Sequence, residues 1–363
     1  MGSIPASPTI PCSPRLRVLA MKALLLADYK KLELADVPVP EPREDELLIR
    51  VRACGICGSD VHGYDGSTGR RIPPIVMGHE AAGVVETVGG AVRGFAQGDR
   101  VTFDSTIYCD NCFFCRRDEV NLCDNREVLG VSTPLFRRQG AFAEYVTVPA
   151  RVAYKLPDEL PFEHAALIEA VSVAVHAVAL TPIAKGDTVL VVGAGMIGLL
   201  TMQAARAAGA GKIFIADIDP SRLEMARTLG ADLTFDPREA DAVKRIVTAS
   251  SARGADAAIE CVGATAPIQL AIDSARKGGA VTLVGNVSPT AEIGLQSVVS
   301  RQIRLQGSCA SCGEYPRAME LMASGAIQVA PLLSAVAPLD EGIAWFQRLY
   351  AHEPGLLKVV LQP

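Results

Sequence analysis

The chain contains 363 residues, of which 49% are hydrophobic and 21% are charged, and its formal net charge is −5. A single hydrophobic core rarely grows beyond about 250–300 residues, so this length predicts two domains. The mild negative charge gives no electrostatic basis for nucleic-acid binding. The longest apolar run that we identify, residues 189–200, is too short for a transmembrane helix and contains glycines. We therefore expect an ordinary globular protein that binds neither nucleic acid nor membrane.

Ten cysteines are present, and four of them lie between residues 109 and 123. Small secreted proteins use many cysteines for disulfides, but this chain is too long for that class and shows no secretory signal peptide. Tight clustering instead favours metal binding in a reducing compartment. The pattern predicts a cytoplasmic protein.

The N-terminal part is interpreted from its turn residues. Residues 1–20 contain four prolines and predict a disordered tail. Residues 21–173 contain short strand-like runs interrupted by glycine and proline, among them residues 47–52 and 82–89. Short strands with this punctuation are typical of a compact, barrel-like β domain.

The pattern changes near residue 163, where an alanine-rich helix is predicted over residues 163–180. Beyond it, strand and helix patterns alternate at residues 188–192, 196–208, 212–216, 220–229, 257–261, 266–276 and 280–284. This alternation predicts a doubly wound parallel sheet, which we assign to residues 174–300. Residues 301–363 are mixed again, and their last strand, 357–361, is predicted to rejoin the first domain.

A glycine-rich turn follows the first strand of the second domain. Gly193, Gly195 and Gly198 form a GxGxxG pattern between an apolar strand and an apolar helix. In that setting the first glycine makes the turn, the second admits a pyrophosphate and the third lets the helix pack against the strand. The helix N-terminus adds amide donors for an anion. The pattern predicts a dinucleotide site, and the alternative is a glycine turn with a purely structural role.

The next strand of this domain ends at Asp217, roughly 20 positions after the glycines, where an acidic residue binds ribose hydroxyls. A carboxylate at that position repels a 2′-phosphate, so NAD is predicted in preference to NADP. The remaining predicted cofactor-binding residues are Ile197, Arg222, Val262 and Gly285.

Residues 57–80 hold a possible catalytic metal site. Cys57, His79 and Glu80 supply a thiolate, an imidazole and a carboxylate, the three ligand types that zinc accepts in proteins. Three protein ligands leave a fourth position open for water or substrate, as catalytic zinc sites require. The alternative is a buried cysteine beside an unrelated surface His-Glu pair.

A second possible metal site is made of cysteines alone: Cys109, Cys112, Cys115 and Cys123. Four thiolates can surround one tetrahedral ion and close the site to substrate. We therefore predict a structural zinc without a catalytic role. A redox role for a CxxC pair is disfavoured, because no thioredoxin-like βαβ unit surrounds it.

Together these motifs resemble those of the zinc-containing medium-chain dehydrogenases, and within them the sorbitol (polyol) dehydrogenase branch. The resemblance runs from Met21 to the C-terminus and rests on residues 57–60, 78–83, 98–101, 109–123, 168–172 and 193–198. It implies a GroES-like catalytic domain, made of residues 21–173 and the returning 301–363. It further implies a Rossmann NAD-binding domain, an active site in the cleft between the domains, and a homo-oligomer, either tetramer or dimer.

The resemblance also assigns roles to individual residues. It implies that Cys57, His79 and Glu80 hold the catalytic zinc, and that Glu169 binds this zinc or lies close to its water. Ser59 is similar to the family's hydroxyl beside the zinc-bound oxygen, and His62 to a proton-relay position. Asp60 matches the carboxylate that orients the histidine ligand. Packing or surface roles are expected for the remaining histidines, His164, His176 and His352.

One departure from the family bears on the substrate. Similar sorbitol dehydrogenases carry an Arg-Tyr pair after the last domain crossover, where it contacts polyol and cofactor. The matching residues here are Ala310 and Ser311. The chemistry is unaffected, but weaker activity on sorbitol than on the best substrate is predicted.

The predicted function is zinc-dependent hydride transfer between NAD and the secondary alcohol of a polyol, sugar alcohol or diol. One rival is a dehydrogenase of a polyol phosphate or of an amino alcohol such as threonine. A phosphate would need basic residues, for which Arg70–Arg71 and Arg137–Arg138 are candidates. The other rival is a non-enzymatic dinucleotide-binding relative, a class that typically lacks the metal ligands.

Overall fold

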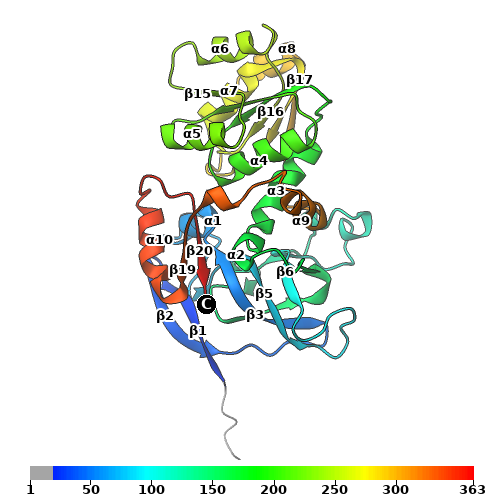
Figure 1. The fold of residues 1–363 in the computed structure, drawn as a ribbon, viewed down its shortest axis with the longest axis vertical. Helices are drawn as coiled ribbons and strands as arrows, with labels where there is room; N and C mark the ends of the chain where they lie inside the picture. Colours follow the sequence, from blue (N-terminus) through cyan, green and yellow to red (C-terminus); the bar gives the residue numbers. More distant parts are fainter. Residues whose placement is uncertain (1–18) are drawn as a thin grey trace, which may run out of the picture.

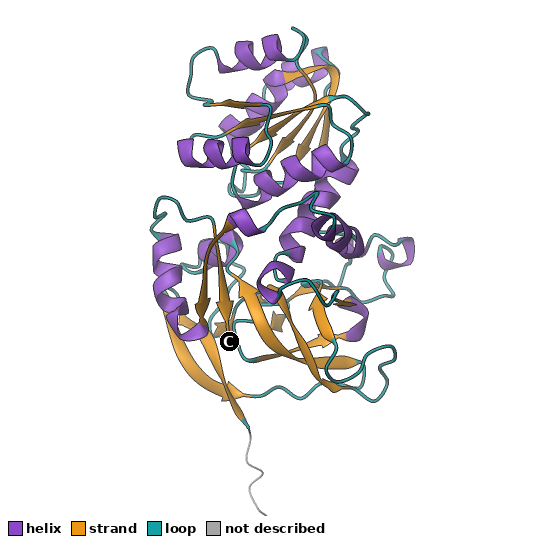
Figure 2. Cartoon of the chain, in the orientation of Figure 1, coloured by secondary structure: helices purple, strands orange, loops and turns teal. Residues whose placement is uncertain are grey.

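The structure is a computed structural model that describes residues 19–363. The disordered tail predicted for residues 1–20 lies, apart from its last two residues, outside the described part. The chain forms two lobes stacked along its long axis, and the C-terminus ends in the lower one (Figure 1). The lower lobe is mostly strand, whereas helices flank the sheet of the upper lobe (Figure 2). The predicted mixed α/β fold class is confirmed.

The lower lobe is built around a seven-stranded sheet. Its order is β12–β6–β5–β3–β20–β19, and β11 also pairs with β3. The strands are β3 (Glu46–Gly55), β5 (Glu80–Val88), β6 (Arg100–Phe103), β11 (Tyr145–Pro149), β12 (Ala153–Lys155), β19 (Leu333–Pro338) and β20 (Lys358–Gln362). Strand β20 runs antiparallel to β3, with Val360 opposite Gly55. The last strand thus rejoins the first domain, as the sequence predicts.

Smaller elements complete the lower lobe. A three-stranded sheet has the order β2–β1–β4, and β7 pairs with β8 and β9 with β10. These elements are β1 (Ala20–Asp28), β2 (Lys31–Pro38), β4 (Ile75–Val76), β7 (Thr106–Ile107), β8 (Glu127–Val128), β9 (Val131–Ser132), β10 (Arg137–Arg138), α1 (Gly58–Gly63) and α10 (Gly342–Tyr350). Short 3-10 turns lie at Cys115–Arg117, Val120–Leu122, Ala150–Val152, Ala330–Leu332 and Leu339–Glu341.

The upper lobe is the predicted doubly wound sheet, with six parallel strands in the order β15–β14–β13–β16–β17–β18. The strands are β13 (Thr188–Val192), β14 (Lys212–Ala216), β15 (Leu233–Phe235), β16 (Ala255–Glu260), β17 (Ala275–Leu283) and β18 (Arg304–Gly307). The helices are α4 (Met196–Ala207), α5 (Pro220–Thr228), α6 (Ala242–Ala249), α7 (Thr265–Ser274) and α8 (Leu295–Ser300). Both β15 and α6 were absent from the sequence prediction.

The upper sheet extends beyond the boundary that we expected at residue 300. Strand β18 follows the short helix α8 and still pairs in parallel with β17, where Leu283 lies opposite Gly307. The return to the lower lobe therefore begins after Gly307. A single strand of four residues after a one-turn helix gives little periodicity, which is why the sequence placed the boundary too early.

Two helices connect the lobes where one was predicted. The helix expected over residues 163–180 is divided into α2 (Phe162–Ala165) and α3 (Ile168–Leu180). Helix α3 packs against α4 of the upper lobe and against α9 (Tyr315–Ala323), which follows the return crossing. One hydrophobic cluster spans both lobes and includes Ala53, Val171 and Ile259. The lobes are therefore joined by a continuous apolar core.

This connecting stretch also corrects one sequence expectation. Phe162–Leu180 is long and apolar enough to cross a membrane, although we expected no such run in the chain. Its alanines raise the hydropathy without adding bulk. Because 61% of the stretch is buried inside the protein, α2 and α3 are accounted for as core helices.

Candidate active site

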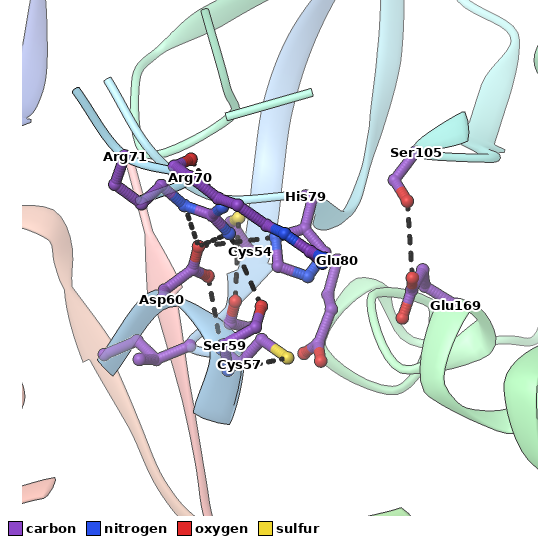
Figure 3. A network of polar contacts seen from close by, with 12 residues as sticks. Cys54, Cys57, Ser59, Asp60, Arg70, Arg71, His79, Glu80, Ser105 and Glu169 are labelled. Atoms are coloured by element: carbon purple, nitrogen blue, oxygen red, sulfur yellow. Dashed lines mark hydrogen bonds and ion pairs between the residues drawn. The ribbon is translucent and has the colours of Figure 1, made fainter. Parts of the chain in front are cut away.

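Three donor side chains converge where strand β3 ends and strand β5 begins. Cys57 precedes α1, His79 precedes β5, and Glu80 is the first residue of β5. One ligand atom from each lies within 4.8 Å of the others. Figure 3 shows the Cys57 sulfur, the His79 ring and the Glu80 carboxylate facing a common space. The arrangement offers zinc three mixed ligands and leaves room for a fourth.

Strand pairing brings these donors together. Gly55 lies opposite Glu80 in the β3–β5 ladder, so Cys57, two residues on, lies near the carboxylate. A Cβ on Gly55 would approach Glu80 Oε2 to 2.3 Å. Gly78 has φ +93°, and a Cβ there would contact both Phe142 and Cys54 within 3 Å. The left-handed backbone at position 78 therefore requires glycine, and a side chain at position 55 would displace the Glu80 carboxylate.

Cys57 is held by the start of helix α1. Its sulfur accepts a hydrogen bond from the Ser59 N–H at 3.5 Å, and Asp60 Oδ2 accepts from the Cys57 N–H at 3.4 Å. This reciprocal pair caps the helix N-terminus. These two contacts fix the position of the Cys57 side chain relative to α1.

Asp60 is fully buried. Its carboxylate lies between His79 and Arg71 (Figure 3). Its Oδ1 lies 3.4 Å from His79 Nδ1 and accepts hydrogen bonds from Arg71 Nη2 at 2.9 Å and Nε at 3.3 Å. Burial alone would raise the pKa of Asp60, but the charges of His79 and Arg71 hold that pKa well below its usual range. The carboxylate thus stays ionised and orients the imidazole, so that His79 Nε2 is left for a metal.

Arg71 is a functional neighbour that the sequence analysis missed. The side chain is only 4% exposed, and its Nη2 also donates to Ser59 Oγ at 3.4 Å. A Cβ on Gly63 would lie 2.3 Å from Arg71 Cγ, so this glycine makes room for the arginine. The sequence signal was the RR pair itself, which we interpreted as a possible phosphate contact.

Lys358 was also missed, although it is the lone charge in an otherwise apolar strand. Its Nζ donates to Glu80 Oε2 at 2.6 Å, to Oε1 at 2.9 Å and to the Ile56 carbonyl at 3.1 Å. Burial lowers the pKa of Lys358, but the Glu80 charge outweighs it and the net shift is upward. The returning strand β20 thereby contributes a buried cation to the site.

Glu169 does not join the three grouped donors. It lies in the first turn of α3 and accepts a hydrogen bond from Ser105 Oγ at 3.3 Å (Figure 3). Burial raises its pKa to about 7; the His79 charge opposes this rise, and Glu80 and Asp104 add to it. Of the two roles implied for Glu169, the one beside the metal fits this placement better than direct ligation.

Ser59 and His62 both lie on α1 and are exposed. Ser59 Oγ accepts from Arg71, so its own proton is directed elsewhere. The His62 carbonyl accepts from Ser67 Oγ at 2.9 Å, while its ring is exposed to solvent. A hydroxyl near the donors and an imidazole at the surface fit the two ends of a proton path.

The second donor set lies in a separate segment of the chain, residues 109–126, which we call the cysteine lobe. Cys109, Cys112, Cys115 and Cys123 place their sulfurs within 4.8 Å of one another. The nine cysteines of the described residues are free thiols. Asp110 and Asp118 have φ values near +60°, which turn the chain sharply around the cluster. Four thiolates at this separation fit a closed tetrahedral zinc site.

The predicted nucleotide-binding residues gather at the carboxyl ends of the parallel strands. Gly193 has φ +96°, and a Cβ on Gly198 would lie 1.7 Å from the Gly193 carbonyl oxygen. Asp217 Oδ2 accepts from the Ala194 N–H at 2.6 Å, so it also fixes the glycine turn. Such an edge, where a helix begins, suits a dinucleotide pyrophosphate.

The other predicted cofactor residues lie around this turn. Val262 packs against Gly193, and Gly285 fits closely against Gly263. Ile197 is half-buried on α4, and Arg222 lies 3.6 Å from Asp219 Oδ2. Arg238 donates to the carbonyl of Ile218, the residue after Asp217, at 2.9 Å, and it also pairs with Asp236.

Comparison with known proteins agrees with this geometry. Residues 43–158 match the alcohol dehydrogenase GroES-like domain, and residues 197–324 match the zinc-binding dehydrogenase domain. Sorbitol dehydrogenase of Bacillus subtilis is 35% identical over 94% of this chain and 97% of its own length. Human sorbitol dehydrogenase is 36% identical, covering 91% and 92%. A zinc-binding dehydrogenase structure from Sinorhizobium meliloti 1021, bound to NADP, superposes with TM-score 0.87 at 35% identity, covering 95% and 100%.

The fold and the two donor sets define a zinc-type, dinucleotide-dependent dehydrogenase. The chain belongs to the zinc-containing medium-chain dehydrogenase family and is similar to its sorbitol dehydrogenases. It is therefore an enzyme, and the rival reading as a non-enzymatic binding protein is not supported.

Proposed function

We propose that this protein oxidises the secondary alcohol of a polyol, sugar alcohol or diol, with NAD as hydride acceptor. The observation that carries the proposal is the mixed donor set of Cys57, His79 and Glu80, with Glu169 set just outside it. The sorbitol dehydrogenases among its relatives support the substrate class.

Each residue of the site has its own role in this reaction. Zinc, when bound by Cys57, His79 and Glu80, would supply Lewis acidity that lowers the pKa of an alcohol. Asp60 orients His79, and Lys358 balances the charge of Glu80. Ser59 receives the alcohol proton and passes it outward, through His62 or water. The glycine turn and Asp217 orient the nicotinamide dinucleotide for hydride transfer.

The preference for NAD rests on the Asp217 carboxylate and on the residue after it, Ile218, which is not basic. Asp217→Asn keeps an acceptor for the Ala194 N–H but removes the charge that repels a 2′-phosphate. The ratio of kcat/KM for NAD to that for NADP should fall by roughly tenfold or more, the worth of about 1.4 kcal/mol. A wild-type enzyme that uses NADP as well as NAD would refute the proposed preference.

The contacts of the two arginine pairs argue against a polyol phosphate as substrate. Arg71 is committed to Asp60, and Arg138 donates to Glu46 at 2.7 Å. Arg137 donates to the Pro74 carbonyl at 2.5 Å. No described contact gathers these side chains into a phosphate site, so uncharged polyols and diols remain the favoured substrates.

The substrate test compares kcat/KM across sorbitol, other polyols, vicinal diols, threonine, a polyol phosphate and ethanol. We expect sorbitol to rank below the best polyol or diol, because Ala310 cannot supply a forked cationic contact. Ala310→Arg should raise kcat/KM for sorbitol. Ser311 is left unchanged, since it is 2% exposed and has no room for tyrosine. Sorbitol as best substrate would refute the role given to residue 310, and ethanol as best would refute the polyol assignment.

We further propose a cytoplasmic homo-oligomer, a dimer or tetramer. Val287, Leu295 and Val299 are 62–70% exposed near the edge strand β18 of the upper sheet, which favours burial against a second copy. The free thiols favour a reducing compartment. Light scattering of the purified protein tests the assembly, and a monomer at micromolar concentration would contradict it.

A further inference from the structure

The loop that carries Ala310 is tied to the lobe of four cysteines. This crossover loop, residues 308–314, connects β18 to α9. Asn121, in the cysteine lobe (residues 109–126), donates from Nδ2 to the Cys309 carbonyl at 2.8 Å. Cys312 Sγ donates to the Asp118 carbonyl at 3.0 Å. Arg126 Nη1 also donates to Cys309 Sγ at 3.2 Å. Three residues of the cysteine lobe thus hold two residues of the crossover loop, and Asn121 and Cys309 are 188 positions apart in sequence.

Helix α3 supplies further contacts at the same place. His176 Nε2 lies 3.4 Å from Asn121 Nδ2, and its Nδ1 lies 2.7 Å from Glu314 Oε1. Glu314 Oε2 in turn accepts from the Cys312 N–H. Asn121 and His176 are 5% and 7% exposed, so these are interior contacts whose loss leaves buried polar groups unpaired.

The opposite side of the crossover loop reaches the active site. Ser311 Oγ donates to Asp104 Oδ2 at 3.4 Å, and both residues are buried. Ser105, the residue after Asp104, donates to Glu169 at 3.3 Å. Polar contacts, joined by short stretches of the chain itself, therefore connect the cysteine lobe through the crossover loop to Glu169, the carboxylate beside the catalytic donors.

From these contacts we infer that Asn121 is a positioning residue, through which the cysteine lobe fixes the crossover loop and hence the substrate side of the active site. Asn121 precedes the donor Cys123 by two residues, and its carbonyl accepts from Arg126 at 2.6 Å. Ordering of the cysteine lobe by its metal thus sets the place of the Asn121 amide. The structural site acts on substrate binding without touching the substrate.

The first test replaces Asn121 by aspartate, which has the same shape but presents an acceptor to the Cys309 carbonyl. Hydrogen exchange, followed by mass spectrometry, reports on the peptide 308–315 in the zinc-loaded enzyme. We expect exchange there to quicken by about tenfold, the factor that corresponds to one buried hydrogen bond. Two zinc ions per chain should be retained. The control is Leu122→Ala, which alters the neighbouring exposed side chain and should leave exchange unchanged.

The kinetic consequence rests on the proposed function. In Asn121→Asp the KM for the alcohol should rise by about tenfold while the KM for NAD stays unchanged. A general loss of structure would instead raise both constants together. If the wild-type enzyme oxidised none of the tested alcohols, the proposed function would fail, whereas the exchange result would still decide the positioning role.

A second variant guards against misfolding of the first. Glu314→Gln keeps an acceptor for His176 but turns an amide N–H toward the Cys312 N–H. Exchange in residues 308–315 should again quicken, and a smaller change than in Asn121→Asp is expected because the Asn121 contact remains. Unchanged exchange of this peptide in the folded variants, with both zinc ions bound, would overturn the inference. So would equal increases in the two KM values.

Discussion

The two donor sets of this protein are assembled in opposite ways. The four cysteines come from one stretch of 15 residues and use a single residue type. Cys57, His79 and Glu80 come from two strand ends and use three residue types, and they depend on buried charges at Asp60, Arg71 and Lys358. The cysteine set is complete in itself, whereas the mixed set is supported by residues up to 278 positions away.

This difference shows what each set is suited to do. A closed shell of thiolates satisfies a metal locally and adds to folding stability. A mixed shell with an open position must be held from outside, because the site lacks a fourth protein ligand to fix it. Changes at the mixed set should therefore affect turnover most, and changes at the cysteine set should affect stability most.

The largest effect is expected for Cys57→Ala. Turnover should fall to background, because the open metal site loses its thiolate, while zinc content falls only from two ions to one. Metal analysis and kcat measure the two changes. Cys54→Ala is the matched control, since Cys54 is buried three residues earlier but is not a grouped donor. Loss of both zinc ions from a folded Cys57→Ala protein would show that the sites are not independent.

Cys112→Ser should act mainly on stability. Removing one thiolate from the closed set loses part of the folding free energy that the metal supplies, which is about 10–16 kcal/mol for structural zinc in zinc-finger peptides. We expect a lower melting temperature and one zinc ion per chain, with measurable turnover below that temperature. Phe113→Ala, a change at an exposed neighbour, should leave both unchanged. An unaltered melting temperature after loss of the ion would contradict a stabilising role.

Arg71→Leu tests how far the mixed set depends on its surroundings. The change removes the arginine partner of the buried Asp60 carboxylate, and breaking a buried ion pair costs about 3–5 kcal/mol. It should also weaken zinc binding at His79 by roughly 10–100-fold, the range for residues that orient a ligand. Chelator competition measures the affinity, and urea unfolding measures the stability. Arg71→Lys should lose less, and Arg70→Leu, at an exposed neighbour, should lose neither; equal losses in all three variants would refute the role of Arg71.

The smallest effect is expected for Asp104, which contacts the crossover loop between the cysteine set and the mixed donor set. Burial raises its pKa from the usual 3.8 to about 6, although the Thr106 N–H and the Ser311 hydroxyl lower it. Between pH 3.8 and about pH 6, Asp104 keeps a proton in the folded state that it releases in the unfolded state, so the free energy of unfolding falls as pH rises. A shift of about 2 pKa units, at about 1.4 kcal/mol each, corresponds to about 3 kcal/mol.

Asp104→Asn removes this dependence, because the amide does not ionise. The variant should match the wild type near pH 4 and be more stable above pH 6. Melting temperatures at a series of pH values between 4 and 8 measure the difference. Parallel curves for the two proteins would show that Asp104 has no raised pKa in the folded state.

Much of the fold could be predicted from residue patterns. Strands β13 and β14 begin and end where the sequence placed them, since buried parallel strands form unbroken apolar runs. Strand β15 and helix α6 were missed because their patterns are short and exposed. The predicted helix over residues 163–180 was divided because its alanines carry no signal for the break at residues 166–167.

The sequence by itself determined the chemistry that local spacing can carry: the four thiolates, the glycine turn with Asp217, and the Cys-His-Glu donors. Only the tertiary structure decided which charges those donors face. Arg71 and Lys358 became partners of the site because strand pairing buried them beside Asp60 and Glu80. The structure also decided that His176 contacts both Asn121 and Glu314, because α3 packs against the cysteine lobe and the crossover loop. A buried charge requires a partner wherever the fold places it, and sequence spacing gives no measure of that distance.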